Sequence, residues 1–111
     1  MGVGQTSVAA ATAVVGYDLA NGTNWQNQSK HRALTGFAIK GSAAAGDTKV
    51  DVLIDTVKVG EFYNISTGFP NMDDLIPMDN LFIPAGAQVH VLVTDAPATN
   101  PINIMFVWED V

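Results

Sequence analysis

Apolar and polar residues alternate over short runs in this chain, and residues that favour turns separate the runs. The clearest alternation lies at 48–54, where Val50, Val52 and Ile54 share one face of an extended backbone and polar side chains take the other. Short runs of this kind, bounded by glycine, proline, asparagine and aspartate, are typical of an all-β sandwich or barrel. The pattern therefore predicts a fold built from strands.

The segment 78–94 repeats the pattern around a turn. Its two β-type runs, 81–83 and 89–93, flank a Pro-Ala-Gly sequence at 84–86. The proline fixes φ and has no N–H to donate to a strand, and the glycine accepts a positive φ. We therefore expect the chain to reverse direction at this turn. A second reversal, or a bulge, is expected at 55–56, because the apolar residues change phase there.

These runs predict an all-β fold, an antiparallel and jelly-roll-like β-sandwich of about eight strands. The expected strands cover 7–17, 33–40, 48–54, 57–59, 62–65, 81–83, 89–93 and 102–108. Residues in phase on the inner faces of the strands form the expected core. They are Phe37, Ile39, Val50, Val52, Ile54, Leu81, Ile83, Val89, Val91, Val93, Ile104 and Phe106. Trp108 is in phase with Phe106, which indicates core or intersubunit packing.

Residues 1–30 differ from the rest of the chain. They carry one charged side chain before Lys30 and are rich in alanine, glycine, threonine and amide residues. We predict that they form an extended N-terminal arm or edge strand that pairs outside its own domain, and that residues 31–111 form the sandwich. The β-branched residues of the arm favour a strand at 7–17, although the alanines at 9–11 also suit the start of a helix.

The composition is apolar for a small protein: 48% of the 111 residues are hydrophobic and 14% are charged. So few charges indicate that another protein covers part of the surface. The formal charge of −6 disfavours contact with the phosphate backbone of DNA or RNA, so we expect no nucleic-acid partner. No apolar run approaches the roughly 18 residues of a membrane span, so we expect no membrane partner. The absence of cysteine excludes disulfides and thiolate chemistry.

One loop gathers acidic and amide residues. Asp73, Asp74 and Asp79 lie near Asn71 and Asn80, and calcium binds six to eight oxygens of this kind. The spacing matches no EF-hand pattern, however, and turn formation by aspartate and asparagine side chains explains the cluster as well. We therefore predict no metal site and no cofactor.

The sequence offers little catalytic equipment. His31 and His90 are the only histidines, and no motif assembles a Ser-His-Asp or Cys-His arrangement. His90 stands between Val89 and Val91, so on a strand its side chain points away from theirs, toward a surface or an interface. We predict that the protein is not an enzyme.

Interface residues are expected in the loops 67–80 and 96–101 and in the N-terminal arm, because loops on a rigid sandwich commonly carry recognition. Among the aromatic residues, Trp25 and Phe69 fall in predicted loops that a ligand can reach. The full set predicted at an interface is Tyr17, Trp25, Phe69, Met72, Asp73, Asp74, His90 and Pro97.

The style of strands and turns is informative in four segments, 36–47, 60–64, 83–88 and 100–110. Together they resemble small single jelly-roll proteins of virus particles, closest to the decoration, or cement, proteins of tailed-phage capsids. The resemblance covers about residues 33–110. It implies a homotrimer, or a pentamer, that is assembled in the host cytoplasm and binds the major capsid protein on the outer surface of the virion. It implies no catalytic residues.

Two other classes of protein remain as alternatives. A carbohydrate-binding module or an adhesin-type domain is also a small acidic β-sandwich, and its binding edge would be Trp25, Phe69 and the loop of Asp73 and Asp74. A cupin-type enzyme needs clustered histidines, which the sequence lacks.

Overall fold

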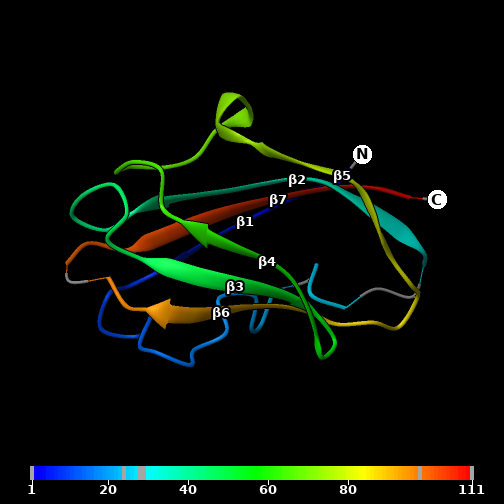
Figure 1. Ribbon diagram of the computed structural model, residues 1–111, viewed down its shortest axis with the longest axis horizontal. Helices are drawn as coiled ribbons and strands as arrows, with labels where there is room; N and C mark the ends of the chain where they lie inside the picture. The colour runs from blue at the N-terminus through cyan, green and yellow to red at the C-terminus, as the bar shows by residue number, and fades with distance from the viewer. Residues whose placement is uncertain (1, 24, 28–29, 98, 111) are drawn as a thin grey trace.

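The computed structural model describes residues 2–23, 25–27, 30–97 and 99–110, which form seven strands and one short 3₁₀ helix (Figure 1). All strand pairs are antiparallel. The elements are β1 (Gly2–Val8), β2 (Arg32–Gly41), β3 (Lys49–Ile54), β4 (Val57–Tyr63), η1 (Met72–Asp74), β5 (Ile76–Ile83), β6 (Val89–Asp95) and β7 (Ile102–Asp110). No helix in these described ranges is long and apolar enough to cross a membrane.

The strands form two sheets with the orders β1-β7-β2-β5 and β4-β3-β6. Figure 1 looks onto the three-stranded sheet, with the four-stranded sheet behind it. In a jelly roll with strands lettered B to I, the two sheets have the orders B-I-D-G and C-H-E-F. The seven strands take all of these places except that of C, the neighbour of β6. The predicted all-β antiparallel sandwich is confirmed, with seven strands in place of about eight.

Residues 16–23 and 25–27 occupy the place of the missing strand. Gly16 and Leu19 donate backbone hydrogen bonds to β6, and β6 donates to Tyr17 and Gln26, at 2.8–3.0 Å. Only isolated bridges form, because the segment turns repeatedly: Gly16 and Gly22 have φ of 91° and 78°. An irregular segment therefore covers the edge of β6.

The N-terminal strand is β1 at Gly2–Val8, so the predicted strand at 7–17 is wrong. The chain leaves the sheet at Ala9, whose carbonyl accepts hydrogen bonds from the N–H groups of Thr12 and Ala13. β1 pairs with β7 of the same domain in unbroken register. The segment also buries Ala13, Leu19, Ala20 and Trp25 in the main core. Residues 2–23 and 25–27 therefore pack within the sandwich, and β1 is an edge strand of its four-stranded sheet.

Between β3 and β4 the chain has both a reversal and a register shift, the two alternatives that the change of phase predicts. Asp55 and Thr56 form a tight hairpin turn in which Asp55 has a φ of 54°, and the register of the two strands shifts between Val52 and Leu53. The expected strands at 57–59 and 62–65 are one strand, β4.

The Pro-Ala-Gly turn forms as predicted, with a hydrogen bond of 3.1 Å from the N–H of Ala87 to the carbonyl of Pro84 and a φ of 84° at Gly86. The strands on its two sides do not pair with each other, however. β5 pairs with β2 and β6 pairs with β3, so the turn carries the chain from one sheet to the other.

The core lies between the sheets, and the predicted core residues are buried except for Ile54 and Leu81, which pack half-buried at its rim. Trp108 also packs against the core from the end of β7. A second, smaller cluster lies on the outer face of the four-stranded sheet, where Leu75 packs against Ala38, Met105 and Val107. That cluster anchors the connection 64–75 to the outside of the sandwich.

Candidate functional site

Three connections meet at one end of the sandwich: 42–48, 64–75 and 96–101 (left in Figure 1). We call this the loop end. Two of its segments, 67–70 and 99–101, belong to the loops in which the sequence predicts recognition. Pro101 accepts a hydrogen bond from the N–H of Ser42 at 3.1 Å, so the connections are joined to one another.

Asn64 is the centre of the loop end. Its side chain is 1% exposed and donates to the carbonyls of Gly41 and Ala44 at 2.9 and 2.8 Å, while its Oδ1 accepts from the N–H of Thr48 at 2.9 Å. A buried amide whose donors and acceptor are all paired fixes its surroundings in one arrangement. Asn64 thus holds the connections 42–48 and 64–75 together.

Further contacts fix the connection 64–75 along its length. Asn103 on β7 donates to the carbonyl of Gly68 at 2.8 Å, and Asn71 caps η1 by accepting from the N–H of Asp73 at 2.9 Å. Asp74 closes the capping box on the N–H of Asn71 at 2.9 Å and pairs with Lys40 at 3.0 Å. The loop is therefore tied at both ends and at its middle.

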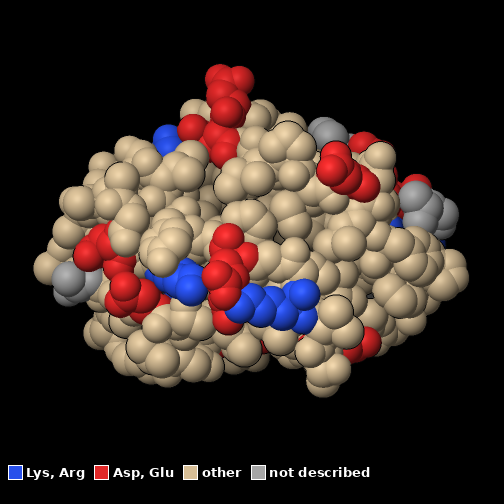
Figure 2. Space-filling model, viewed as in Figure 1, with Lys and Arg blue, Asp and Glu red and all other residues tan. Residues whose placement is uncertain are grey.

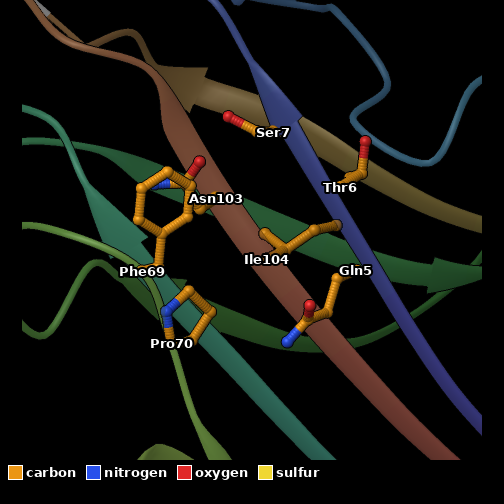
Figure 3. A pocket seen from close by; sticks show the side chains of 7 residues that line it. All are labelled: Gln5, Thr6, Ser7, Phe69, Pro70, Asn103 and Ile104. Atoms are coloured by element: carbon orange, nitrogen blue, oxygen red, sulfur yellow. The ribbon is translucent and has the colours of Figure 1, made fainter.

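Phe69 stands on this fixed loop with 71% of its surface exposed. Phe69 and Pro70 line one side of an open hollow of about 390 Å³, Gln5 and Ser7 line the other, and Asn103 of β7 lies between them (Figure 3). We call this hollow the Phe69 groove. Asn103 is 3% exposed, and its Oδ1 has no hydrogen-bond partner among the described residues. The groove combines an aromatic ring with amide and hydroxyl groups.

Among the acidic residues predicted near this loop, Asp74 forms contacts that stabilise the local fold. The hydrogen bond from the N–H of Asn71, together with the ammonium of Lys40, lowers the pKa of Asp74. Asp73 is exposed and Asp79 lies on β5 with a φ of 52°. Within the described residues no group of three or more histidine, cysteine, aspartate or glutamate side chains is placed to hold a metal ion.

Trp25 is not available to a ligand, which corrects its prediction as an exposed loop residue. The indole is 2% exposed and stacks on Phe106 with the ring centroids 4.8 Å apart. It fits because β1 has a glycine at position 4: a Cβ there would lie 2.3 Å from the indole. Tyr17 is half-buried and packs against the same core.

His90 makes a contact inside the chain, to the first segment. Its Nδ1 lies 2.8 Å from Oδ2 of Asp18, and the two side chains are 27% and 18% exposed. Asp18 also accepts from Gln26 Nε2 at 2.8 Å and from the N–H groups of Ala20 and Val91 at 2.9 Å. Asp18 therefore fastens residues 16–27 to β6, and nothing in the sequence pairs it with a residue so distant along the chain.

The remaining predicted interface residues divide between surface and interior. Met72 is 50% exposed on η1, near Phe69 in the same connection. Pro97 is buried in the connection 96–101, where a partner cannot contact it directly. Of the predicted set, Phe69, Met72 and Asp73 are thus the most exposed side chains.

A different surface lies along the edges of β4 and β5. Val57 and Phe82 are 64% and 54% exposed there, and with Val59 and Leu81 they line a hollow of about 450 Å³. We call this surface the β4–β5 strip. Figure 2 shows a row of basic and acidic side chains over β3 and β4. In that row Lys49 pairs with Glu61 at 3.3 Å, and Lys58 pairs with Glu61 and with Asp51.

No protein-family model matches this sequence, and no curated protein is significantly similar to it. The assignment of function therefore depends on the geometry and chemistry of these surfaces.

Proposed function

We propose that this protein is a non-enzymatic capsid decoration (cement) protein, which oligomerises on the outer surface of a phage virion and stabilises the shell by bridging capsid subunits. The observation that carries the proposal is Phe69, an aromatic ring that is 71% exposed on a loop held by Asn64, Asn71 and Asn103. An aromatic side chain presented by a rigid loop is a typical anchor for a protein–protein contact, because little conformational entropy is lost on binding.

The β4–β5 strip supports the self-association that the proposal includes. Val57, Val59, Leu81 and Phe82 leave apolar surface exposed between two sheet edges, and a homotrimer that covers this surface would bury it. Several weak capsid contacts then act together, because the subunits of one trimer are linked and their attachments reinforce each other. The charge of −6 suits an outer surface, since packaged nucleic acid repels an acidic chain.

The test uses phage particles purified with and without this protein. Particles that lack it should release their genome at a lower temperature, and addition of the purified protein should restore the resistance to heat. Phe69→Asp should abolish rebinding to the particles while the oligomer persists. Phe82→Asp should break the three-fold contact and so dissociate the trimer. Failure of the wild-type protein to bind any capsid would overturn the proposal.

Carbohydrate binding is a second candidate, and the Phe69 groove is the observation that favours it. The ring of Phe69 can stack on a sugar face, while Gln5, Ser7 and the unpaired Oδ1 of Asn103 can bond to hydroxyl groups. Trp25 and its surroundings take no part, since the indole is buried. Binding of the isolated protein to an oligosaccharide on a glycan array at micromolar affinity, lost in Phe69→Ala, would favour this candidate.

A further inference from the structure

The two sheets have four edges, and three of them are blocked against another strand. An open sheet edge presents unpaired N–H and C=O groups, and proteins commonly protect such edges with covering segments, charges, proline or bulges. The edge of β6 is covered by residues 16–27, which take its backbone hydrogen bonds at 2.8–3.0 Å.

The edges of β4 and β5 are protected by their own residues. β4 carries Lys58 and Glu61, and its register shifts opposite Val52 and Leu53. β5 contains Pro77, and its register against β2 is broken where Asp79 and Asn80 have φ of 52° and 53°. A bulged or kinked strand with proline and charge is a poor template for a neighbouring strand.

The edge of β1 has none of these protections. Its seven residues, Gly2–Val8, contain no proline and no charged side chain, and they pair with β7 without a shift in register. Among the hydrogen bonds of the described residues, those of β1 go to β7, so alternate N–H and C=O groups face away from the sheet. Among the strands of the described residues β1 pairs with β7 alone, so β1 forms the edge of its sheet.

We propose that β1 pairs with β1 of a second copy of this chain, antiparallel about a two-fold axis at Gln5, so that the two four-stranded sheets become one. Any strand that pairs antiparallel with its own copy is self-complementary in its backbone hydrogen bonds. Gln5 is the middle residue of β1, so this register pairs the whole of the strand.

The distribution of charge identifies the occupant as a second copy. Two chains of charge −6 repel each other wherever their acidic side chains meet. Residues 2–17 carry no charged side chain, so the edge of β1 is a place where two copies can approach at low electrostatic cost.

Side chains on the outer face of the sheet support the same register. Val3, Gln5 and Ser7 point outward, and Val3 is 46% exposed. Pairing about Gln5 places Val3 of one copy opposite Ser7 of the other. Ser7 is one of the residues that line the Phe69 groove, so each Val3 lies beside the rim of its partner's groove.

This contact goes beyond the proposed function and does not depend on it, because it forms between copies of the chain without a capsid. The β4–β5 strip lies at the edges of β4 and β5 and stays free for the three-fold contact that the proposed function includes.

Disulfide cross-linking of the purified protein tests the pairing, and the cysteine-free chain gives a clean background. Residues directly opposite each other in an antiparallel pair have Cβ atoms about 4.5–5.5 Å apart, close to the reach of a disulfide. Gln5→Cys should therefore cross-link with itself under mild oxidation. Val3→Cys alone should not, because the two copies of residue 3 lie about 13 Å apart along the strands. A mixture of Val3→Cys and Ser7→Cys should cross-link as the unlike pair.

Two outcomes would overturn the pairing. One is the absence of a Gln5→Cys cross-link in folded protein, and the other is equally fast cross-linking of Val3→Cys alone, which indicates random collision. Light scattering adds a second measurement. Gln5→Lys puts two ammonium groups at the axis and should weaken self-association at this edge at least tenfold, while Ala45→Lys, in an exposed connection that belongs neither to β1 nor to the β4–β5 strip, should leave it unchanged. Equal association of both variants also overturns the pairing.

A strand from another protein is the competing occupant, and the same edge reveals it. Hydrogen exchange of β1 amides that slows only when capsid is added, in a protein that shows no Gln5→Cys cross-link, assigns the edge to a capsid strand. Failure of capsid binding with a positive cross-link leaves the self-pairing intact and overturns the proposed function alone.

Discussion

Residues 9–27 and the connection 64–75 are both long irregular segments rich in small and polar residues, and they lie in very different environments. The first covers the edge of β6 and contributes Trp25 and Leu19 to the core. The second crosses the outside of the sheet and leaves Phe69 exposed. Both are held by polar side chains, Asp18 in one and Asn64 in the other. Rigidity is thus common to both segments, and burial of the aromatic side chain is what distinguishes them.

The largest expected effect is that of Trp25→Ala. Removal of a buried aromatic side chain costs about 3–5 kcal/mol in the free energy of unfolding. We expect the lower end of this range, because the buried Nε1–H has no hydrogen-bond partner among the described residues and its loss removes that penalty. Urea unfolding measures the change.

Trp25→Phe is the matched variant, since it keeps a ring beside Phe106 and removes the unpaired N–H. It should destabilise much less than Trp25→Ala. Equal stability of Trp25→Ala and wild-type protein would contradict the assignment of the first segment to the core.

Asp18→Asn should have the next largest effect. The substitution replaces Oδ2 of Asp18, which accepts from Gln26 and contacts His90, with an amide NH₂ group. This group is a donor, as is Nε2 of Gln26, so the hydrogen bond between the two side chains is lost. Loss of hydrogen bonds to a charged acceptor costs about 1.5–3 kcal/mol. Hydrogen exchange should report faster opening of residues 16–27 and of β6, with little change in β2. Equal exchange rates of this segment and of β6 in the variant and in the wild type would argue against the role of Asp18 in holding the segment on β6.

The ion pair of Asp74 should stabilise the fold at neutral pH and lose this effect at strongly acidic pH. The folded protein lowers the pKa of Asp74 through the N–H of Asn71 and the ammonium of Lys40, so the ionised carboxylate stabilises the fold. That stability is present above the unfolded pKa of about 3.9 and is lost as the pH falls through the folded pKa. Asp74→Asn should therefore lower the Tm at about pH 7 and have a smaller effect near pH 2.

Lys40→Met provides the control, because it removes the ammonium and keeps the Asp74 carboxylate on the N–H of Asn71. Its effect on the Tm should also shrink at low pH and should be smaller than that of Asp74→Asn. A pH-independent difference between Asp74→Asn and wild-type protein would count against the ion pair as its origin.

Phe69→Ala should have the smallest effect on stability. The ring is 71% exposed, and surface substitutions of this kind usually change the free energy of unfolding by about 0.5 kcal/mol or less. Differential scanning calorimetry should give a Tm close to that of the wild type. A large loss of stability would show that Phe69 belongs to the core like Trp25, and would remove it as a binding residue.

Local patterns in the sequence predicted the parts of the fold that depend on alternation. β3 and β7 have apolar residues at every second position, and their inner residues Val50, Val52, Ile104 and Phe106 are all buried as predicted. Asp55 and Gly86 lie at reversals that the change of phase and the turn residues indicated. These predictions succeeded because the two-residue period of a strand and the φ preference of a turn are properties of neighbouring residues.

The candidate site was predictable only in part. Phe69 lies in a loop rich in glycine and proline and is exposed as predicted. Trp25 lies in a similarly polar loop, and its burial depends on the lack of a Cβ at Gly4, on another element. The alternating glycines of β1 are the one signal in the sequence for large side chains packed across that strand. The pairing of Asp18 with His90 had no local signal.

Composition and short-range periodicity are enough to predict the all-β class, most of the core, the small number of charged residues and the acidic net charge. Which polar segment covers an edge, which aromatic ring is buried and which strand edge stays open follow from the packed domain alone. Those outcomes depend on contacts between residues far apart in the chain, such as Asp18 with Val91 and Gly4 with Trp25. Such contacts form only when the whole domain packs, because a close-packed interior leaves each side chain little choice of position.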